Sequence, residues 1–342
     1  MIWLTWRQHR KQLLFTVLGL AVLAALMVPT GRQMHRAYVD TGLADCLHKL
    51  GRSELIPVES SACRPQLQQF NNKYENFAFL GALFVFLPLL VGMFFGGPLV
   101  AREVEHGTHR LVWTQGVSRL RWAIVKFGLV GASAVAVATA YALLLSWWFM
   151  PLNHSVSSRL SWLFFDVQGI VPVAYTLFAV ALGTFAGTVW RRVLPAMAVT
   201  LVGFLGLRIA VAVLARPRFR PTVERRFPVL GTMLPNPAND DWVMSQGIYT
   251  ASGKLVASDS MALCGSRPGA SPSPGGLSQT PSPAPSGPQS PCAEYGVGAY
   301  NAQTYQPGGR FWLFQYIEAG LFVALAALLL SLAVRQVRRR IS

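Results

Sequence analysis

The sequence predicts an all-α polytopic membrane protein with six transmembrane helices, both termini on the cytoplasmic side and two sizeable outer loops. The 342 residues are 52% hydrophobic and 13% charged, with a mean hydropathy of +0.39, and this balance is too apolar for a soluble domain. The apolar residues form runs long enough to cross a hydrocarbon core of about 30 Å as helices of roughly 20 residues. The basic residues, which give a net charge of +16, cluster mainly at the ends of these runs, as membrane topology requires. We therefore expect no nucleic acid partner, although a pI near 10.5 alone would suggest one.

The amino-terminal residues 1–12 predict an amphipathic helix at the membrane interface, and an ordinary basic flank explains them as well. They combine two tryptophans with three basic residues, Trp3, Trp6, Arg7, Arg10 and Lys11. Residues 13–29 form the first apolar run. A basic start before an apolar centre is also typical of a signal peptide, but no small-x-small cleavage site follows it and five more spans do. An uncleaved first helix is the simpler expectation.

The second and third spans, residues 77–100 and 123–149, flank a charged segment. The second span contains Pro88 and several glycines, so we expect it to bend or to pack closely against a neighbour. The charged segment, residues 101–122, holds more basic than acidic side chains, which indicates a short cytoplasmic loop. The third span ends in an aromatic belt and leads to an outer turn, residues 150–161.

The fourth span, residues 162–189, contains Gly183 and Gly187. Their G-x-x-x-G spacing lets another helix approach closely, without indicating which one. The remaining elements follow by alternation and by the four arginines of the tail: an inner turn 190–192, the fifth span 193–215, the sixth span 311–334 and the cytoplasmic tail 335–342.

Two polar segments, residues 30–76 and 216–310, fall on the outer side by alternation. The second contains a central run, residues 265–291, dense in Gly, Ser, Pro and Gln, which we interpret as an insertion without a fold of its own. One observation opposes the topology. Five arginines directly follow the fifth span on the outer side, namely Arg216, Arg218, Arg220, Arg225 and Arg226. Long loops obey the charge rule only weakly, so both termini remain inside in this prediction.

The four cysteines lie in these outer segments, Cys46 and Cys63 in the first and Cys264 and Cys292 in the second. Outside a bacterial plasma membrane they can oxidise. Pairing within each segment is the most economical of the three possible connectivities, and free thiols are the alternative.

Arg208 and Glu318 are charged residues well inside the fifth and sixth predicted spans. Each lies about seven residues from the outer end of its span, so at 1.5 Å per residue both lie roughly 10 Å below the outer surface. A lone charge there costs on the order of 2.5–3.5 kcal/mol on insertion scales, which predicts an ion pair between the two. The alternative is that Arg208 extends toward the headgroups and Glu318 is protonated.

The chain shows few motifs for chemistry of its own. It has no G-x-x-x-x-G-K-[ST] phosphate loop, so it does not bind ATP in the usual way. Glu103, His106 and His109 are spaced like metal ligands on a helix, but Gly107 interrupts that helix and a solvated charged face explains the same residues, so we expect no metal. The spans also lack the paired carboxylates or histidines that intramembrane hydrolases and proton relays use. We expect neither an enzyme nor a cofactor bound by this chain.

One stretch is similar to a known family. Residues 102–108 read R-E-x-E-x-G-T, and V-S-R at residues 117–119 and Lys126 follow, between the second and third of six spans. With the missing ATPase, this pattern resembles a type-2 ABC transporter permease, more narrowly the actinobacterial permeases of this class. Residues 191–201 and 311–320 look similar too, whereas the outer segments match poorly. The resemblance implies a permease of a bacterial plasma membrane, usually an exporter, driven by a separate ABC ATPase subunit and completed by a second permease, identical or homologous.

In that family the loop between the second and third spans docks on the ATPase. The resemblance therefore implies a coupling element here, with Arg102, Glu103, Glu105, His106, Gly107, Thr108, Trp113 and Arg119. Glu103 and Glu105 can accept charge-assisted hydrogen bonds from a basic partner, Trp113 offers an apolar anchor, and Gly107 permits the turn. The alternative is that these residues only solvate the loop.

Two other functions are compatible with six spans. A membrane anchor or sensor that presents its outer segments to a ligand would need them to form a folded domain, which the low-complexity run 265–291 argues against. A secondary transporter should show inverted repeats and midplane ion ligands, which we do not find. The residues do not indicate a substrate.

Overall fold

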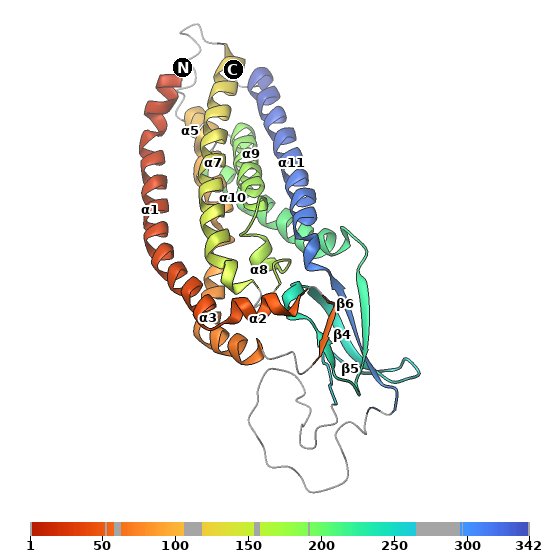
Figure 1. Cartoon of the computed structure of the whole chain (residues 1–342). Coiled ribbons are helices and arrows are strands. Elements are labelled where there is room, and N and C mark those ends of the chain that lie inside the picture. The colour runs from red at the N-terminus through yellow and green to blue at the C-terminus, as the bar shows by residue number, and fades with distance from the viewer. Residues whose placement is uncertain are drawn as a thin grey trace.

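The computed structural model describes residues 2–51, 53–57, 63–105, 118–153, 158–190, 192–264, 295 and 297–340. Over these residues the fold is mostly helical, and six segments are long and apolar enough to cross a membrane, which confirms the six predicted helical spans. The helices lie side by side, with both chain ends at one end of the bundle and a β-sheet at the other (Figure 1). The six spans are Leu14–Asp40, Arg64–Glu103, Leu120–Leu152, Val171–Trp190, Val193–Arg218 and Gly308–Arg338.

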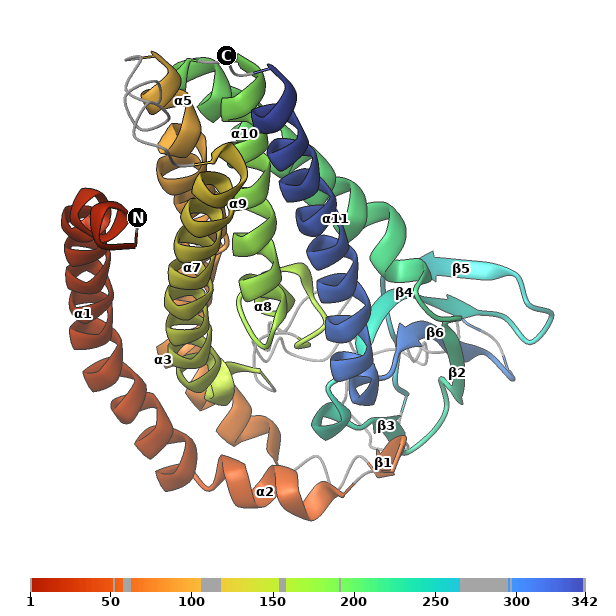
Figure 2. The ribbon, with the colours of Figure 1, turned by 90° about the horizontal axis from the view of Figure 1, so that it is seen from above.

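The first span belongs to one long helix, α1 (Ile2–Asp40), which also contains the segment predicted to lie at the interface. The helix passes through Pro29 and continues with the polar residues after it, and it ends before Gly42, which has a left-handed φ of +70°. Of the 18 most apolar consecutive residues of the first span, only 11% are buried inside the protein. Helix α1 therefore lies at the margin of the bundle, beside α7 (Arg119–Phe149) (Figure 2).

The second span is built from several helical pieces. Its α-helical geometry is interrupted at residues 85–86, just before Pro88, which has no amide hydrogen to donate. It is interrupted again in a π-helical turn bounded by two glycines. The irregularity expected from proline and glycine is thus present at both places. The pieces are α3 (Arg64–Phe84), α4 (Leu87–Val91), the π-helical turn (Gly92–Gly96) and α5 (Gly97–Glu105).

Helix α9 is the centre of the bundle. Of its 18 most apolar consecutive residues, 67% are buried, which is the largest share among the six spans. It packs against α5, α7, α10 and α11 (Figure 2). A short helix, α8, precedes it, so the predicted fourth span is split in two. The remaining helices are α8 (Trp162–Phe165), α9 (Val171–Trp190), α10 (Val193–Ala210) and α11 (Phe311–Arg340).

Glycines bring the second span into direct backbone contact with α9. A Cβ atom at Gly96 would lie 2.6 Å from the carbonyl oxygen of Val180. On the facing helix, a Cβ at Gly183 would lie 2.6 Å from the amide nitrogen of Gly97. A Cβ at Gly187 would lie 2.9 Å from the carbonyl oxygen of Gly97. The G-x-x-x-G of the fourth span therefore faces the glycine-rich half of the second span.

A folded β domain covers the end of the bundle opposite the chain termini (Figure 1). We call it the cap; it consists of α2 (Leu43–Leu50) and strands β1 to β6. A four-stranded antiparallel sheet has the order β2-β6-β4-β5, and β1 pairs with β3. The prediction from sequence lacks this sheet, and the low-complexity run 265–291 lies outside the described residues. The strands are β1 (Leu55–Pro57), β2 (Val223–Pro228), β3 (Met233–Pro235), β4 (Trp242–Tyr249), β5 (Leu255–Ser258) and β6 (Tyr300–Gln306).

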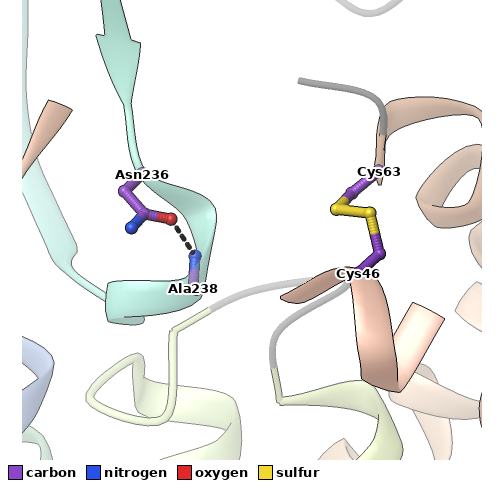
Figure 3. Close-up of a disulfide and its surroundings, with 4 residues drawn as sticks. All are labelled: Cys46, Cys63, Asn236 and Ala238. Atoms are coloured by element: carbon purple, nitrogen blue, oxygen red, sulfur yellow. Dashed lines mark hydrogen bonds between the residues drawn. A yellow bond between two sulfur atoms is a disulfide. The ribbon is translucent and has the colours of Figure 1, made fainter. Parts of the chain in front are cut away.

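The two outer segments form one cap instead of two separate loops. Besides the β1–β3 pair, Asn236 joins them: its side-chain amide donates to the carbonyl oxygens of Gly51 at 3.2 Å and Ser53 at 3.0 Å. Its Oδ1 accepts from the amide of Ala238 at 3.0 Å and so begins the next helical turn (Figure 3). The residue that shapes one segment is therefore also the residue that binds the other.

A disulfide joins Cys46 of α2 to Cys63 at the start of α3, so this predicted pairing is confirmed (Figure 3). Cys264 is buried in the core of the cap and is disulfide-bonded. Cys292, its predicted partner, lies outside the described residues.

Two of the arginines that opposed the charge rule take part in folding the cap. Arg225 donates to Asp241 at 3.1 Å and to the side chain of Gln303 at 2.9 Å. Arg226 pairs with Glu224 on the surface at 2.6 Å, and this hydrogen bond lowers the pKa of the Glu224 carboxyl. These charges have partners within the cap, so their position does not require that end of the bundle to be cytoplasmic.

Candidate functional site

The described flanks of the predicted coupling element, the end of α5 and the start of α7, lie at the end of the bundle that carries the chain termini (Figure 1). Arg102, Glu103 and Glu105 lie in the last turns of α5, and Arg119 is the first residue of α7. Ser118 caps α7, because its hydroxyl accepts from the amide of Arg121 at 3.3 Å. Four predicted residues of the element lie outside the described part of the chain: His106, Gly107, Thr108 and Trp113.

Glu103 forms an ion pair with Lys126 of α7. The Lys126 side chain is 4% exposed and that of Glu103 15%, and the Lys126 ammonium lies 5.1 Å from the centre of the Trp122 ring. The pair therefore links the end of the second span to the start of the third in a largely water-free place, where removing one partner is costly. Glu103 is already engaged inside the chain.

Glu105 is exposed and contacts a third span. Its Oε2 accepts from the backbone amide of Val193, the first residue of α10, at 3.1 Å. The first amides of a helix have no partner within it, and a carboxylate there also complements the helix dipole. Together, Glu103 and Glu105 join the termini-side ends of the second, third and fifth spans.

At the cap end of the bundle, five buried polar side chains form what we call the charge cluster: Asp166, Tyr175, Arg208, Arg216 and Glu318. Arg208 of α10 donates from Nη2 to Oδ2 of Asp166 at 2.5 Å. Arg216 donates from Nη2 to the other oxygen of Asp166, and from Nε and Nη2 to the two oxygens of Glu318 at 2.9 and 2.8 Å. The hydroxyl of Tyr175 on α9 donates to Glu318.

The charge cluster is balanced and surrounded by aromatic rings. Two guanidinium groups face two carboxylates, so the formal charges cancel. The guanidinium of Arg216 lies 4.1 Å from the centre of the Phe165 ring, and that of Arg208 lies 5.6 Å from the centre of the Tyr175 ring. Charges in such a core are tolerated when each is paired and hydrogen-bonded, which describes this arrangement.

A break in the fourth span places Asp166 in the charge cluster. Gly169 has a φ of +70°, which favours glycine, and a Cβ there would lie 2.6 Å from Oε1 of Gln315. That oxygen accepts from the amides of Ile170 and Val171, each at 3.0 Å, and so caps the start of α9. A side chain from the sixth span therefore holds the break open, and Asp166 sits in the turn between α8 and α9.

An irregular end of the fifth span places Arg216. A π-helical turn (Val211–Ala215) follows α10, and a 3-10 turn (Arg216–Arg218) follows that. The span thus continues past residue 215, its predicted end, and Arg216 lies in the core instead of the outer segment. Single π-helical turns are frequent at functional sites.

The direct ion pair predicted between Arg208 and Glu318 is wrong in its partners. Both residues belong to the charge cluster, but Arg208 binds Asp166 and Glu318 binds Arg216. Arg208 also does not extend to the surface, since it is buried. The expectation that the spans lack paired carboxylates is wrong as well, because Asp166 and Glu318 share one guanidinium group.

Sequence reasoning missed Asp166 and Arg216, and a signal existed for one of them. Asp166 is an ionisable residue within the predicted span 162–189, and such residues are functional candidates by default. Arg216 follows the predicted end of its span by one residue, within the ordinary error of a helix boundary.

Comparison with known proteins gives one match. A family model described as ABC-2 membrane transporter related covers residues 17–216, more than half of the chain. The matched range contains three of the six spans and most of two more, it contains three of the four charges of the charge cluster, and it ends before β2. No curated protein and no solved structure matches the chain.

Proposed function

Because the chain belongs to the ABC-2 membrane transporter related family, we propose that it is the permease subunit of an ATP-driven exporter in a bacterial plasma membrane. It is a multi-pass membrane protein. A separate ABC ATPase subunit binds and hydrolyses ATP, and this chain binds no cofactor. A second permease, identical or homologous, completes the pathway through the membrane.

The observation that carries the proposal is the set of contacts around the coupling element. Glu103 binds Lys126 of α7, so the two flanks of the loop are joined to each other, and Glu105 caps α10, so the first flank is also joined to the fifth span. A partner that moves residues 101–122 would therefore move the second, third and fifth spans together. Rigid elements of this kind carry movement between sites in switching proteins.

The contacts indicate different roles for different residues of the coupling element. Glu103 has its own partner in Lys126, so we assign it to transmission of movement and not to docking. The docking surface then consists of exposed Glu105 and the residues that follow it, with Trp113 as the apolar anchor that interfaces favour.

The charge cluster has a complementary role at the cap end. Its pairs join the turn before α9 to α10 and α11, and separating these helices would leave charges without partners in the core. We propose that the charge cluster keeps the cap ends of these spans fixed relative to one another. The spans then pivot about this fixed end when the ATPase moves their other ends.

The folded cap supports a second candidate, a membrane anchor or sensor that presents the cap to a ligand. Its sheet and α3 border a cavity of about 410 Å³, within the size range of small-molecule sites. A sensor of this kind needs no ATPase, so association with one distinguishes the two functions.

Site-specific photo-cross-linking tests the proposal. A photoreactive amino acid replaces Trp113 in one variant and Trp162, which is exposed at the cap end of the bundle, in a control variant. We expect the variant at position 113 to cross-link an ABC ATPase in native membranes and the variant at position 162 not to do so. Cross-links to no ATPase, with both variants inserted in the membrane, would favour the sensor.

A further inference from the structure

We propose that α1 and α3 form a binding site for the headgroup phosphate of an anionic phospholipid. A cavity of about 470 Å³ lies between the two helices at the cap end of the bundle. Arg32 and Arg36 line it from α1, together with Asp40, and Lys73 and Tyr74 line it from α3. We call it the headgroup site.

The headgroup site has an excess of positive charge that no ion pair with a described residue neutralises. Arg32, Arg36 and Lys73 give +3 and Asp40 gives −1, so the formal sum is +2. The structure shows no ion pair between any of these three cations and another described residue, and all three are exposed. Such cations attract phosphate, and arginine does so with paired hydrogen bonds.

The two arginines are placed to act together. They are four residues apart on α1, so they lie one turn apart on the same helical face. Lys73 stands across the cavity on α3, with its ammonium 5.3 Å from the centre of the Tyr74 ring. The hydroxyl of Tyr74 is buried without a hydrogen-bond partner in the described part of the chain. The site therefore has unused hydrogen-bonding groups on both helices.

The surroundings indicate a lipid and not a soluble anion. Toward the membrane, α1 continues with Leu18, Val22 and Leu26, which recur every four residues and are all more than half exposed. A second cavity, of about 330 Å³ and lined mainly by apolar side chains such as Leu20 and Phe84, lies between α1 and the second span. Phosphate in the headgroup site thus leaves its acyl chains beside apolar surface of the same two spans.

The charge rule sharpens the inference. Basic residues collect at the cytoplasmic ends of spans, and the sequence predicts that the end with the chain termini is cytoplasmic. Arg32, Arg36 and Lys73 lie at the other end, and unlike Arg225 they form no ion pair with an acidic residue in the part of the chain that the structure describes. An anionic headgroup supplies the missing partner.

Native mass spectrometry of the full chain tests the inference. The wild type and the variant R32Q/R36Q are reconstituted in nanodiscs of equal parts phosphatidylcholine and phosphatidylglycerol, and the lipids retained after release are counted. We expect the wild type to retain phosphatidylglycerol preferentially. We expect about thirtyfold weaker retention by the variant, since each basic residue near a membrane surface contributes about a fivefold factor.

Controls separate this site from general charge and from a free anion. The variant R218Q/R220Q removes the same charge from exposed positions at the same end and should retain lipid like the wild type. Lys73→Gln, on the other helix, should weaken retention about fivefold and serves if the double variant folds poorly. Equal retention of both lipids by the wild type would overturn the proposal, as would unchanged retention by the variants. Displacement of the lipid by soluble glycerol 3-phosphate would assign the site to a soluble anion instead.

Discussion

Removing one carboxylate from the charge cluster should destabilise the fold more than removing a carboxylate and a guanidinium together. Asp166→Asn leaves Arg208 and Arg216 with Glu318 alone, so one positive charge in the core has no counterpart. Breaking a buried pair in this way costs about 3–5 kcal/mol. Arg208→Met leaves one negative charge in excess, at a similar cost.

The double variant D166N/R208M restores the balance, because Arg216 and Glu318 still bind each other through two hydrogen bonds. We therefore expect it to be more stable than the sum of the single losses predicts, with a coupling energy of about 2–3 kcal/mol. A second cycle with Glu318→Gln and Arg208→Met tests the partners. That double variant also restores the charge balance, but Arg208 and Glu318 form no ion pair with each other in the structure, so their coupling should be smaller.

A matched pair on the surface provides the reference. Arg226 and Glu224 lie 2.6 Å apart in the cap, with side chains 62% and 49% exposed. The cycle of Arg226→Met and Glu224→Gln should give a much smaller coupling energy than the buried cycle, because solvent screens exposed pairs.

The assay is unfolding of the purified protein in mixed micelles, titrated with sodium dodecyl sulfate and followed by tryptophan fluorescence. The free energy of unfolding is compared for the wild type, both single variants and the double variant of each cycle. Strictly additive losses for Asp166 and Arg208, or a coupling no larger than that of the surface pair, would refute the reasoning. A larger coupling for Arg208 with Glu318 than with Asp166 would restore the partners predicted from the sequence.

Three further variants test the packing, the helix cap and the disulfides. Gly96→Ala should lower stability by about 1–3 kcal/mol, because its Cβ would meet a backbone oxygen at 2.6 Å, whereas Gly128→Ala on α7 meets nothing within 4 Å and should leave the melting temperature unchanged or raise it. Gln315→Ala should cost about 1–3 kcal/mol, because two amides at the start of α9 lose their acceptor; a melting temperature equal to that of the wild type would contradict this. Mass spectrometry of non-reduced peptides should join Cys46 to Cys63 and Cys264 to Cys292, and four freely alkylated thiols would show both pairs to be absent.

The six spans were predictable because long apolar runs have few alternatives in a chain of this composition. The break in the fourth span was not. Residues 162–165 are apolar and continue the run. The side chain that stabilises the break belongs to Gln315, which is 145 residues after Ile170, whose amide it binds. Hydropathy contains no term for such a distant partner, so Asp166 was read as part of a continuous helix.

The partners of Arg208 show what depth arguments can and cannot give. Equal depth correctly placed Arg208 and Glu318 in one cluster. It could not show which helices are neighbours, nor that Arg216 would fold back into the core after a π-helical turn. Residues at span ends therefore need to be counted with the span when intramembrane charges are paired.

The cap was missed for a similar reason. Its sheet pairs β2 with β6, strands separated by more than seventy residues that include the low-complexity run. The strands are short. In β2 and β6 buried residues alternate with less buried ones in the folded cap, but polar residues such as Arg225 and Gln303 occupy buried positions, so the sequence shows no clear apolar alternation. The low-complexity run separates the strands in the sequence, and its composition does not indicate that the residues on either side of it pair in one sheet.

The central claim is that a separate ATPase drives this chain through residues 101–122. Its most direct test is quantitative purification of the chain from its native membranes in mild detergent, with the copies of ABC ATPase per chain counted by mass spectrometry. We predict roughly equal amounts of ATPase and chain for the wild type and for Trp162→Ala, and a strong loss of ATPase for Trp113→Ala. Recovery of intact, folded wild-type chain without an ABC ATPase, or equal recovery of the ATPase with all three proteins, would contradict the account.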